Sequence, residues 1–277
     1  MTRRGTTRLV AFAATTAALV AAAVPATAGA KLVQPISVTG STDSGSLKLK
    51  CPARAVALNA APTSTRGAED SLPAPFARTW TLRFGDGGGS GVLRCVRLDL
   101  PTRVKGVTLA VETKIEPVSE VAPGALQTVP VACSHGNIPT GWGLDRTGAG
   151  NELSIVTAVP GAHGWTFTLE NNGSSGAAGV IYTRCLERKQ RADTGQLHSF
   201  RTRIAKSSVQ GASATRSCRA SEFSVATGVS LSASADILLT GTGPVGTRGG
   251  QWHFAQASGA PPVKTSLICL STTTRFH

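Results

Sequence analysis

Runs of alternating apolar and polar residues recur along the chain and predict short strands. Trp165, Phe167 and Leu169 alternate with Thr and Glu residues, and Leu47 and Leu49 alternate with lysines. A period of two residues is typical of a strand that buries one face. The chain after its first 30 residues contains no convincing 3.6-residue period of an amphipathic helix, and it is rich in Gly, Pro, Thr and Val. The predicted fold class is therefore all-β.

Cysteine and tryptophan recur in the same order three times, which predicts internal repeats. The first cysteines of the three groups lie 82 and 85 residues apart. The groups are Cys51, Trp80 and Cys95; Cys133, Trp165 and Cys185; and Cys218, Trp252 and Cys269. We therefore predict one β-repeat over residues 31–104, a second over residues 105–195 and a third over residues 196–277.

Each predicted repeat has the same series of strands. A first strand and a short strand lead to the first cysteine, and a third strand follows it, as at residues 55–59. Variable loops rich in Gly, Pro and Ser then lead to the tryptophan strand, a turn, and a return strand with the second cysteine. Asn172 and Gly173 are a hairpin signal because both residues tolerate positive φ. The strands of Trp165 and Cys185 are therefore predicted to form a hairpin.

Six cysteines in an exported chain predict three disulfides. No two cysteines lie within four residues of each other, which excludes a Cys-x-x-Cys metal or redox motif. Six cysteines allow 15 pairings, and the repeats favour pairing within each copy. Each such closed loop stabilises a fold by roughly 4 kcal/mol in the chain-entropy model. The predicted pairs are Cys51–Cys95, Cys133–Cys185 and Cys218–Cys269.

Two architectures fit three disulfide-clipped antiparallel repeats. They form three small β-sandwiches in a row, or they pack as one body with pseudo-threefold symmetry. No long Pro/Ser linker separates residues 98 and 107 or residues 186 and 200, which favours the single body, with hairpins bridging successive repeats. In this body the first strand (residues 36–39) pairs with the last (residues 267–272), which hides both sheet edges.

The N-terminus has the pattern of a secretory signal peptide, predicted over residues 1–28. Three arginines precede an uncharged, Ala-rich run over residues 9–24, and small residues place the cleavage site near Ala28 or Ala30. No later segment is apolar over the ~20 residues that a transmembrane helix needs. We therefore expect a secreted, extracellular protein without a transmembrane segment after processing.

The predicted mature chain is basic. Removal of the three signal arginines leaves 25 Lys and Arg against 15 Asp and Glu. A basic protein is attracted to anionic polymers, although the charge also fits a solvated surface. The densest basic run supplies the candidate anionic-surface residues Arg184, Arg188, Lys189, Arg191, Arg201, Arg203 and Lys206. Phe200 is the one aromatic residue within this run, so specific nucleic-acid binding is not expected.

The motif pattern also resembles a known class of secreted proteins. Cys51-Pro52, the turn at Asn172-Gly173 and the Tyr182-Thr-Arg-Cys185 stretch are similar to the tandem Cys…Gly-Trp…Asn…Tyr-x-x-Cys repeats of secreted actinomycete-type proteins. The resemblance covers about residues 33–275. This family is uncharacterised, so the resemblance implies a repeated β fold and an extracellular location, and no activity.

Trp142 has no aromatic counterpart in the other repeats, where Val56 and Val229 match it. It lies among small residues and close to Asp145 and Arg146. An aromatic ring beside hydrogen-bonding groups is a common way to hold a sugar. Trp142, Asp145 and Arg146 are therefore the candidate ligand-binding residues; the alternative is that Trp142 fills a gap in the core.

The chain contains no Gly-x-Ser-x-Gly elbow, His-Glu-x-x-His motif or P-loop. We predict no cofactor and no metal site. The leading hypothesis is a secreted, non-enzymatic β-repeat protein that is structural or binds an anionic polymer or glycan of the cell exterior. The alternatives are a secreted hydrolase of unknown substrate and a secreted protease inhibitor.

Overall fold

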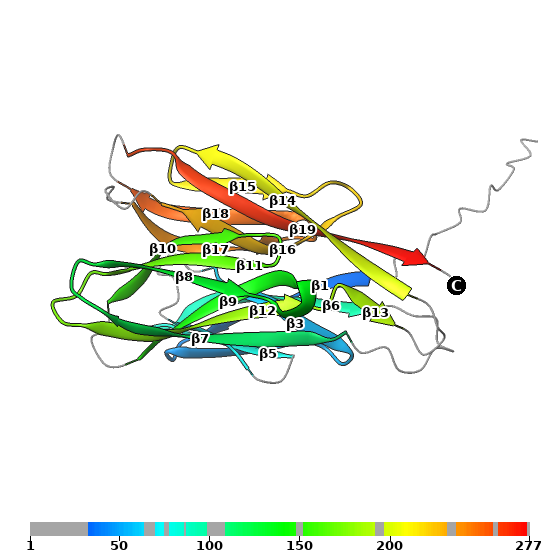
Figure 1. Cartoon of the computed structure of the whole chain (residues 1–277), viewed down its shortest axis with the longest axis horizontal. Coiled ribbons are helices and arrows are strands. Elements are labelled where there is room, and N and C mark those ends of the chain that lie inside the picture. Colours follow the sequence, from blue (N-terminus) through cyan, green and yellow to red (C-terminus); the bar gives the residue numbers. More distant parts are fainter. Residues whose placement is uncertain are drawn as a thin grey trace, which may run out of the picture. The chain divides into compact units, whose positions relative to one another are not determined.

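The fold is built from strands, as the alternating pattern predicts. The computed structural model describes residues 33–63, 70–74, 78–85, 87–98, 109–147, 152–191, 197–231, 237–256 and 260–275. Its regular elements there are 19 strands, β1 to β19, and one 3₁₀ turn at Ser134–Gly136 (Figure 1). The all-β prediction is confirmed, and the predicted signal peptide lies outside the described residues.

Residues 31–104 are called segment 1 below, and their described part forms two antiparallel three-stranded sheets. Their strand orders are β1-β6-β3 and β2-β5-β4, so the cysteine strand and the tryptophan strand are each at the centre of a sheet. The strands are β1 (Val33–Thr42), β2 (Ser46–Lys50), β3 (Ala55–Pro62), β4 (Asp70–Pro73), β5 (Thr79–Arg83) and β6 (Gly89–Leu98).

Residues 105–195, called segment 2, have the same pairing order. β12 lies between β7 and β9, and β11 lies between β8 and β10. The strands are β7 (Val111–Val121), β8 (Leu126–Ala132), β9 (Ile138–Thr147), β10 (Leu153–Pro160), β11 (Gly164–Asn171), β12 (Ala177–Leu186) and the short β13 (Lys189–Arg191).

Residues 196–277, called segment 3, follow the same plan. β19 lies between β14 and β16, and β18 lies between β15 and β17. The strands are β14 (Leu197–Val209), β15 (Ser213–Ser217), β16 (Phe223–Ser230), β17 (Ile237–Val245), β18 (Gly249–Gln256) and β19 (Val263–Arg275). Backbone pairing of β10 with β16 joins the sheets of segments 2 and 3 into one of seven strands.

The predicted hairpin between the tryptophan and cysteine strands is wrong. β11 and β12 belong to different sheets, so the turn between them crosses from one sheet to the other. The Asn171 side chain fixes this turn: its Nδ2 donates to the carbonyls of Val121 and Ser175, and its Oδ1 accepts from the Gly173 N–H. Gly173 is not among the glycines with positive φ, so a polar side chain, rather than a left-handed backbone, makes the turn.

The stretches predicted as loops before each tryptophan strand contain strands. β4, β10 and β17 each pair with the neighbouring tryptophan strand. Their apolar residues are interrupted by Ser, Thr and Gly, and a bulge breaks the register of β10 and of β17. A bulge interrupts a strict two-residue period, which is why the alternation did not identify these strands.

The three predicted disulfides are present and join the two sheets of each segment. The bonds are Cys51–Cys95, Cys133–Cys185 and Cys218–Cys269, with Cα–Cα distances of 5.8, 5.8 and 5.6 Å. The tryptophan of each group is buried, and Trp80 and Trp252 belong to the same buried clusters as the cysteines of their groups. The chain has no free cysteine, so no thiol is available as a nucleophile or metal ligand.

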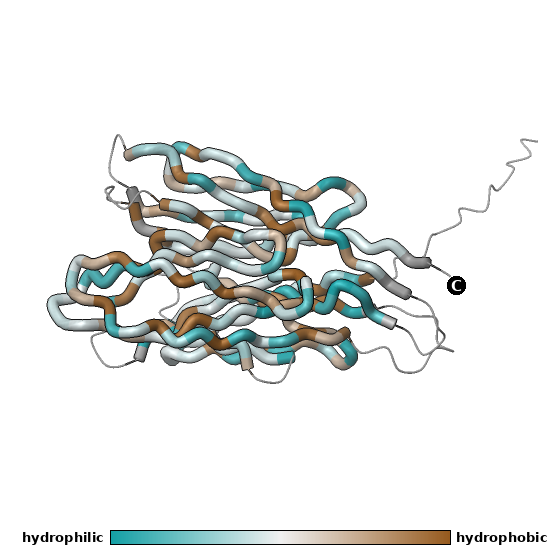
Figure 2. Tube along the Cα trace, in the orientation of Figure 1, coloured by the Kyte–Doolittle hydropathy of each residue, from teal (hydrophilic) through white to brown (hydrophobic). Residues whose placement is uncertain are grey.

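Apolar positions alternate along the strands, as Figure 2 shows by colour, and they form three buried clusters. One cluster lies within segment 1 and one within segment 3. The largest combines segment 2 with residues of both other segments, including Leu58 and Val96 of segment 1 and Val225 and Leu270 of segment 3. The segments therefore share buried surface.

The predicted pairing of the first strand with the last is wrong. β1 pairs with β6 over its whole length, and β19 lies between β14 and β16. Ile36 and Val38 of β1 pack on the cluster of segment 1, so burial of these side chains keeps the strand in its own segment. The predicted hairpin between segments 1 and 2 is absent as well, because β7 pairs with β12 and β6 with β1 and β3. A short hairpin does bridge segments 2 and 3, since β13 pairs antiparallel with β14, the next strand along the chain.

Candidate functional site

A pocket of about 270 Å³ lies where strands of the three segments meet. This volume is close to the lower end of ligand pockets, roughly 300–1,000 Å³. β3 and β4 of segment 1, β9 and β10 of segment 2, and β16 and β17 of segment 3 all contribute to its wall. The lining residues used below are Asn59, Ala60, Trp142, Arg146, Ser154 and Thr227.

Three of these residues occupy equivalent register positions in the three segments. Ala60 is paired with Leu93, Trp142 with Thr183, and Thr227 with Leu267. Each partner lies two residues before the second cysteine of its segment, and each ladder has a register shift just before this pair. The structural counterparts of Trp142 are therefore Ala60 and Thr227, and the assignment of Val56 and Val229 is wrong. Ala60, Trp142 and Thr227 each lie nine residues after the first cysteine of their segment, a constant spacing that identifies them.

Trp142 forms an aromatic wall of the pocket. Its ring lies edge-on to Trp165 and Phe167, with centroid distances of 6.4 and 6.0 Å. Its Nε1 donates to the Thr227 carbonyl at 3.1 Å, which ties segment 2 to segment 3. The ring is only partly buried, so it both packs on the core and presents surface to the pocket.

Asn59 is the buried amide of the pocket wall. It is 3% exposed and belongs to the pocket lining. Segments 2 and 3 have Gly141 and Ala226 at the equivalent register position. The amide is therefore specific to one wall of the pocket.

The structure separates the other two candidate ligand-binding residues. Trp142 and Arg146 lie on the pocket side of β9, whereas Asp145 is absent from the lining. Successive strand residues point to opposite faces, so Asp145 faces Arg83, with 3.6 Å between Arg83 Nη1 and its Oδ1. The structure therefore brings Trp142 and Arg146 together at the pocket and places Asp145 on the other face of β9.

An ion network links segments 1 and 2 beside the pocket. Asp70 accepts from the Arg146 N–H at 2.9 Å, and its Oδ1 lies 3.6 Å from Arg146 Nε. Arg83 lies within 3.7 Å of both Asp70 and Asp145. Burial, and then repulsion by Asp70, raise the pKa of Asp145, and Arg83 partly offsets this. The Arg146 charge is thus balanced by a carboxylate.

Arg184 is not a surface residue, contrary to its place in the predicted basic ribbon. It is 1% exposed. Its guanidinium donates to Thr113 Oγ1 at 2.7 Å and to the Ala74 carbonyl at 3.1 Å, and lies 5.7 Å from the centroid of the Trp80 ring. Burial lowers its pKa to about 10. Because the side chain points into the contact with segment 1, it cannot reach a surface polymer.

The remaining residues of the basic run do not form one ribbon. Lys189, Arg201 and Lys206 are exposed. Arg188 is partly buried, and its Nε donates to the Gly136 carbonyl. Lys206 is an odd number of positions from Arg201 on the same strand and so faces the opposite side of the sheet. The Arg191 side chain lies outside the described part.

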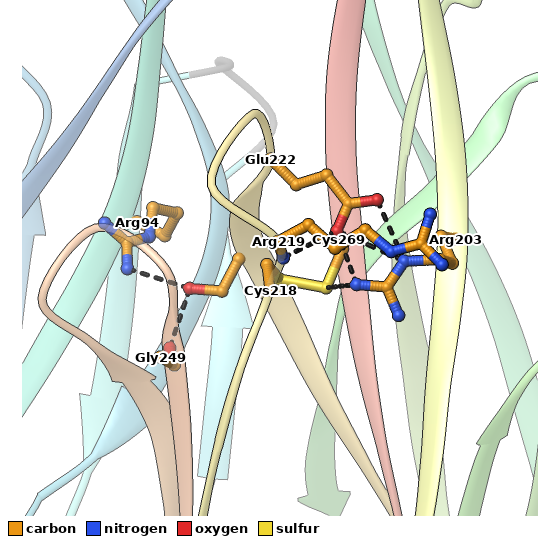
Figure 3. Close-up of a disulfide and its surroundings, with 8 residues drawn as sticks. Arg94, Arg203, Cys218, Arg219, Glu222, Gly249 and Cys269 are labelled. Carbon is orange, nitrogen blue, oxygen red and sulfur yellow. Dashed lines mark hydrogen bonds and ion pairs between the residues drawn. A yellow bond between two sulfur atoms is a disulfide. The ribbon is translucent and has the colours of Figure 1, made fainter.

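Arg203 is paired with a carboxylate next to the Cys218–Cys269 disulfide (Figure 3). Its Nε lies 2.9 Å from Glu222 Oε1, and the Arg219 N–H donates to Glu222 Oε2 at 2.9 Å. The hydrogen bonds from Arg203 hold the pKa of Glu222 below its ordinary value. The positive charge of Arg203 is thus paired with the Glu222 carboxylate.

Among the residues that the structure describes, two groups of potential metal ligands consist of a carboxylate and the sulfurs of a disulfide. Glu112 lies beside Cys133 and Cys185, and Glu222 beside Cys218 and Cys269. Bonded sulfurs are not thiolates, so each group offers one carboxylate ligand.

Arg94 was not identified from the sequence. It is 1% exposed and donates to Ser37 and Ser224 hydroxyls and to the Gly246 carbonyl, which links segments 1 and 3 (Figure 3). Among the described residues, neither Arg94 nor Arg184 forms an ion pair. Each precedes the second cysteine of its segment, which was a usable signal.

The pocket strands β10 and β17 were also missed. β10 contributes Leu153, Ser154 and Ile155 to the lining, and β17 contributes Leu239 and Thr240. The run from Leu153 to Val159 is rich in branched side chains, which favour a strand, but its apolar residues do not alternate strictly with polar ones.

No known protein family matches the chain, and no curated protein matches it. The likeness to secreted tandem repeats therefore stays a prediction. In the described part of the chain, no helix has the length and apolar character required to span a membrane.

Proposed function

We propose that this is a secreted, non-enzymatic binding protein that holds a ring of an extracellular glycan in the pocket between its three segments. The observation that carries the proposal is a pocket whose lining contains both the Trp142 ring and the Asn59 amide. A sugar ring has apolar C–H faces for the tryptophan and hydroxyls for the amide. The predicted signal peptide and the three disulfides support an extracellular location.

The pocket lining supports binding rather than hydrolysis. The described lining residues include no carboxylate, imidazole or thiol, and their one ionisable group is Arg146. Glycoside hydrolysis ordinarily requires a pair of acids. The neutral hydroxyls of Ser154 and Thr240 fit an uncharged ligand. A glycan ring is therefore favoured over a small anion in this pocket.

We infer in addition that the segments are internal repeats around a pseudo-threefold axis near the pocket. Equivalent contacts in cyclic order support it. Gly143 of segment 2 lies against Ser71 of segment 1, and Gly228 of segment 3 against Ala158 of segment 2. Gly243 of segment 3 lies against Ala61 of segment 1. For Lys31–His277, X-ray scattering should give a radius of gyration of about 18 Å; three sandwiches in a row would give a larger value.

Binding is tested by calorimetry with oligosaccharides from cell-wall and acidic glycans. Trp142→Ala is expected to weaken binding at least about tenfold, which corresponds to ~1.4 kcal/mol. Asp145→Asn is the matched control, because Asp145 is on the same strand and faces away from the pocket. No binding by the unaltered protein, or equal loss in both variants, would refute the proposal.

A further inference from the structure

The basic charge is concentrated outside segment 2. Segment 2 carries 7 Lys and Arg against 8 Asp and Glu, whereas segment 3 carries 8 against 2. The described part of segment 3 contains one carboxylate, Glu222, and it is held by Arg203 and the Arg219 N–H. The exposed lysines and arginines in the described part of segment 3 therefore have few carboxylates near them.

Segment 3 departs from the other segments at one edge strand. Inward-facing positions of the corresponding strands are apolar and buried in segments 1 and 2: Leu47, Leu49, Val129 and Val131. In β15, Ala214 is paired with the buried Trp252, and Arg216 with Gly250, so both face the same side as that tryptophan. Arg216 is nevertheless exposed. Because an arginine at this inward position is exposed, the space between the two sheets is accessible to solvent at this edge of the segment.

The open edge is a groove of about 430 Å³ between β14 and β15. Its lining includes Arg216 and the hydroxyl residues Ser207, Ser208, Thr215 and Ser217. Lys206 and Lys264 are exposed on the outer face of the adjoining β14–β19 ladder, where Lys264 is paired with Ser208. No carboxylate is among the described lining residues. Arg216 and the hydroxyl residues thus line the groove, whereas Lys206 and Lys264 lie on the other face of the β14–β19 ladder.

We propose that this groove binds the phosphate groups of a linear anionic polymer of the cell exterior. The guanidinium of Arg216 donates two parallel hydrogen bonds to one phosphate, a geometry that lysine does not provide. The hydroxyls of the lining, such as those of Thr215 and Ser217, complete the shell around that phosphate. This site is separate from the pocket, with which it shares no lining residue.

The test is titration of the purified full chain with inorganic polyphosphate at two salt concentrations. Arg216→Ala is expected to weaken binding about tenfold. Arg216→Lys is expected to weaken it about threefold, because lysine keeps the positive charge but cannot donate two parallel hydrogen bonds to one phosphate. Lys48→Ala removes the same charge from the exposed side of the corresponding strand β2 and is expected to change affinity less than about twofold.

Equal weakening by R216A and K48A would overturn the proposal, since it would assign binding to net charge alone. Binding that appears only with vesicles of anionic phospholipid, or only with duplex DNA, would overturn it in favour of a membrane or nucleic-acid partner. Trp142→Ala should leave polyphosphate binding unchanged, so failure of the pocket proposal and failure of this one are distinguishable. Circular dichroism of each variant checks that the fold is retained.

Discussion

Two tryptophan rings in contact, Trp165 and Trp142, have different surroundings. Trp165 is 2% exposed and stacks on Phe167 at 6.0 Å, inside segment 2. Trp142 lies at the junction of the segments, where its Nε1 is bonded across to Thr227. The first position is tryptophan in every segment, and the second is tryptophan in one. The interior position thus carries the same residue type in all three segments, whereas the residue at the junction differs between them.

The largest expected effect is at the repeated position. Trp165→Ala removes a fully packed ring and should lower the free energy of unfolding by about 4 kcal/mol. Trp142→Ala should cost about half as much, because its ring is only partly buried. Urea denaturation of both variants measures the difference. Equal losses would mean that both rings belong to one interior and would remove the contrast.

The next effect concerns Arg184, which crosses from segment 2 to segment 1. Arg184→Ala leaves the Ala74 carbonyl and Thr113 without their donor, and should cost about 3 kcal/mol. Arg184→Met keeps the volume and removes a buried charge that has no carboxylate partner among the described residues, so it should cost less than about 1 kcal/mol. Chemical denaturation compares the two. A larger loss in R184M than in R184A would mean that the charge itself holds the junction.

The smallest effect is expected at Asp145. Because its pKa is raised in the fold, the folded state binds this proton more tightly than the unfolded state, and stability falls as the pH rises through the raised pKa. At pH 7, Asp145→Asn should therefore be neutral or stabilising by less than about 1 kcal/mol, a gain limited by solvent and by the lost contact with Arg83. Below the ordinary pKa of 3.8 the two proteins should converge. Thermal unfolding from pH 3 to pH 8 follows this difference, and marked destabilisation at pH 7 would contradict the assignment.

The sequence predictions succeeded for features inside one segment and failed for features that depend on contacts between distant strands. The disulfide pairs, the buried repeat tryptophans and the all-β class were predictable because local alternation and cysteine spacing repeat within each segment. The crossing turn at Asn171–Gly173 was not, since a hairpin and a crossing between sheets use the same turn residues. The partners of β1 and β19 were also wrong, because strand pairing depends on where distant apolar faces are buried.

Which side chains alternate, and which cysteines and tryptophans recur, can be read from the sequence, because these are short-range patterns imposed by the strand period. The same period places Asp145 on the face of its strand opposite Trp142. The burial of Arg184 and the position of Asn59 in the pocket of Trp142 depend on how the segments pack in three dimensions. A bulge in each of the ladders formed by β3, β9 and β16 sets the register of these strands. A shift of one residue would move every following side chain to the other face of the sheet. Pocket membership is thus decided by long-range packing between segments, which the spacing of residues along the chain does not encode.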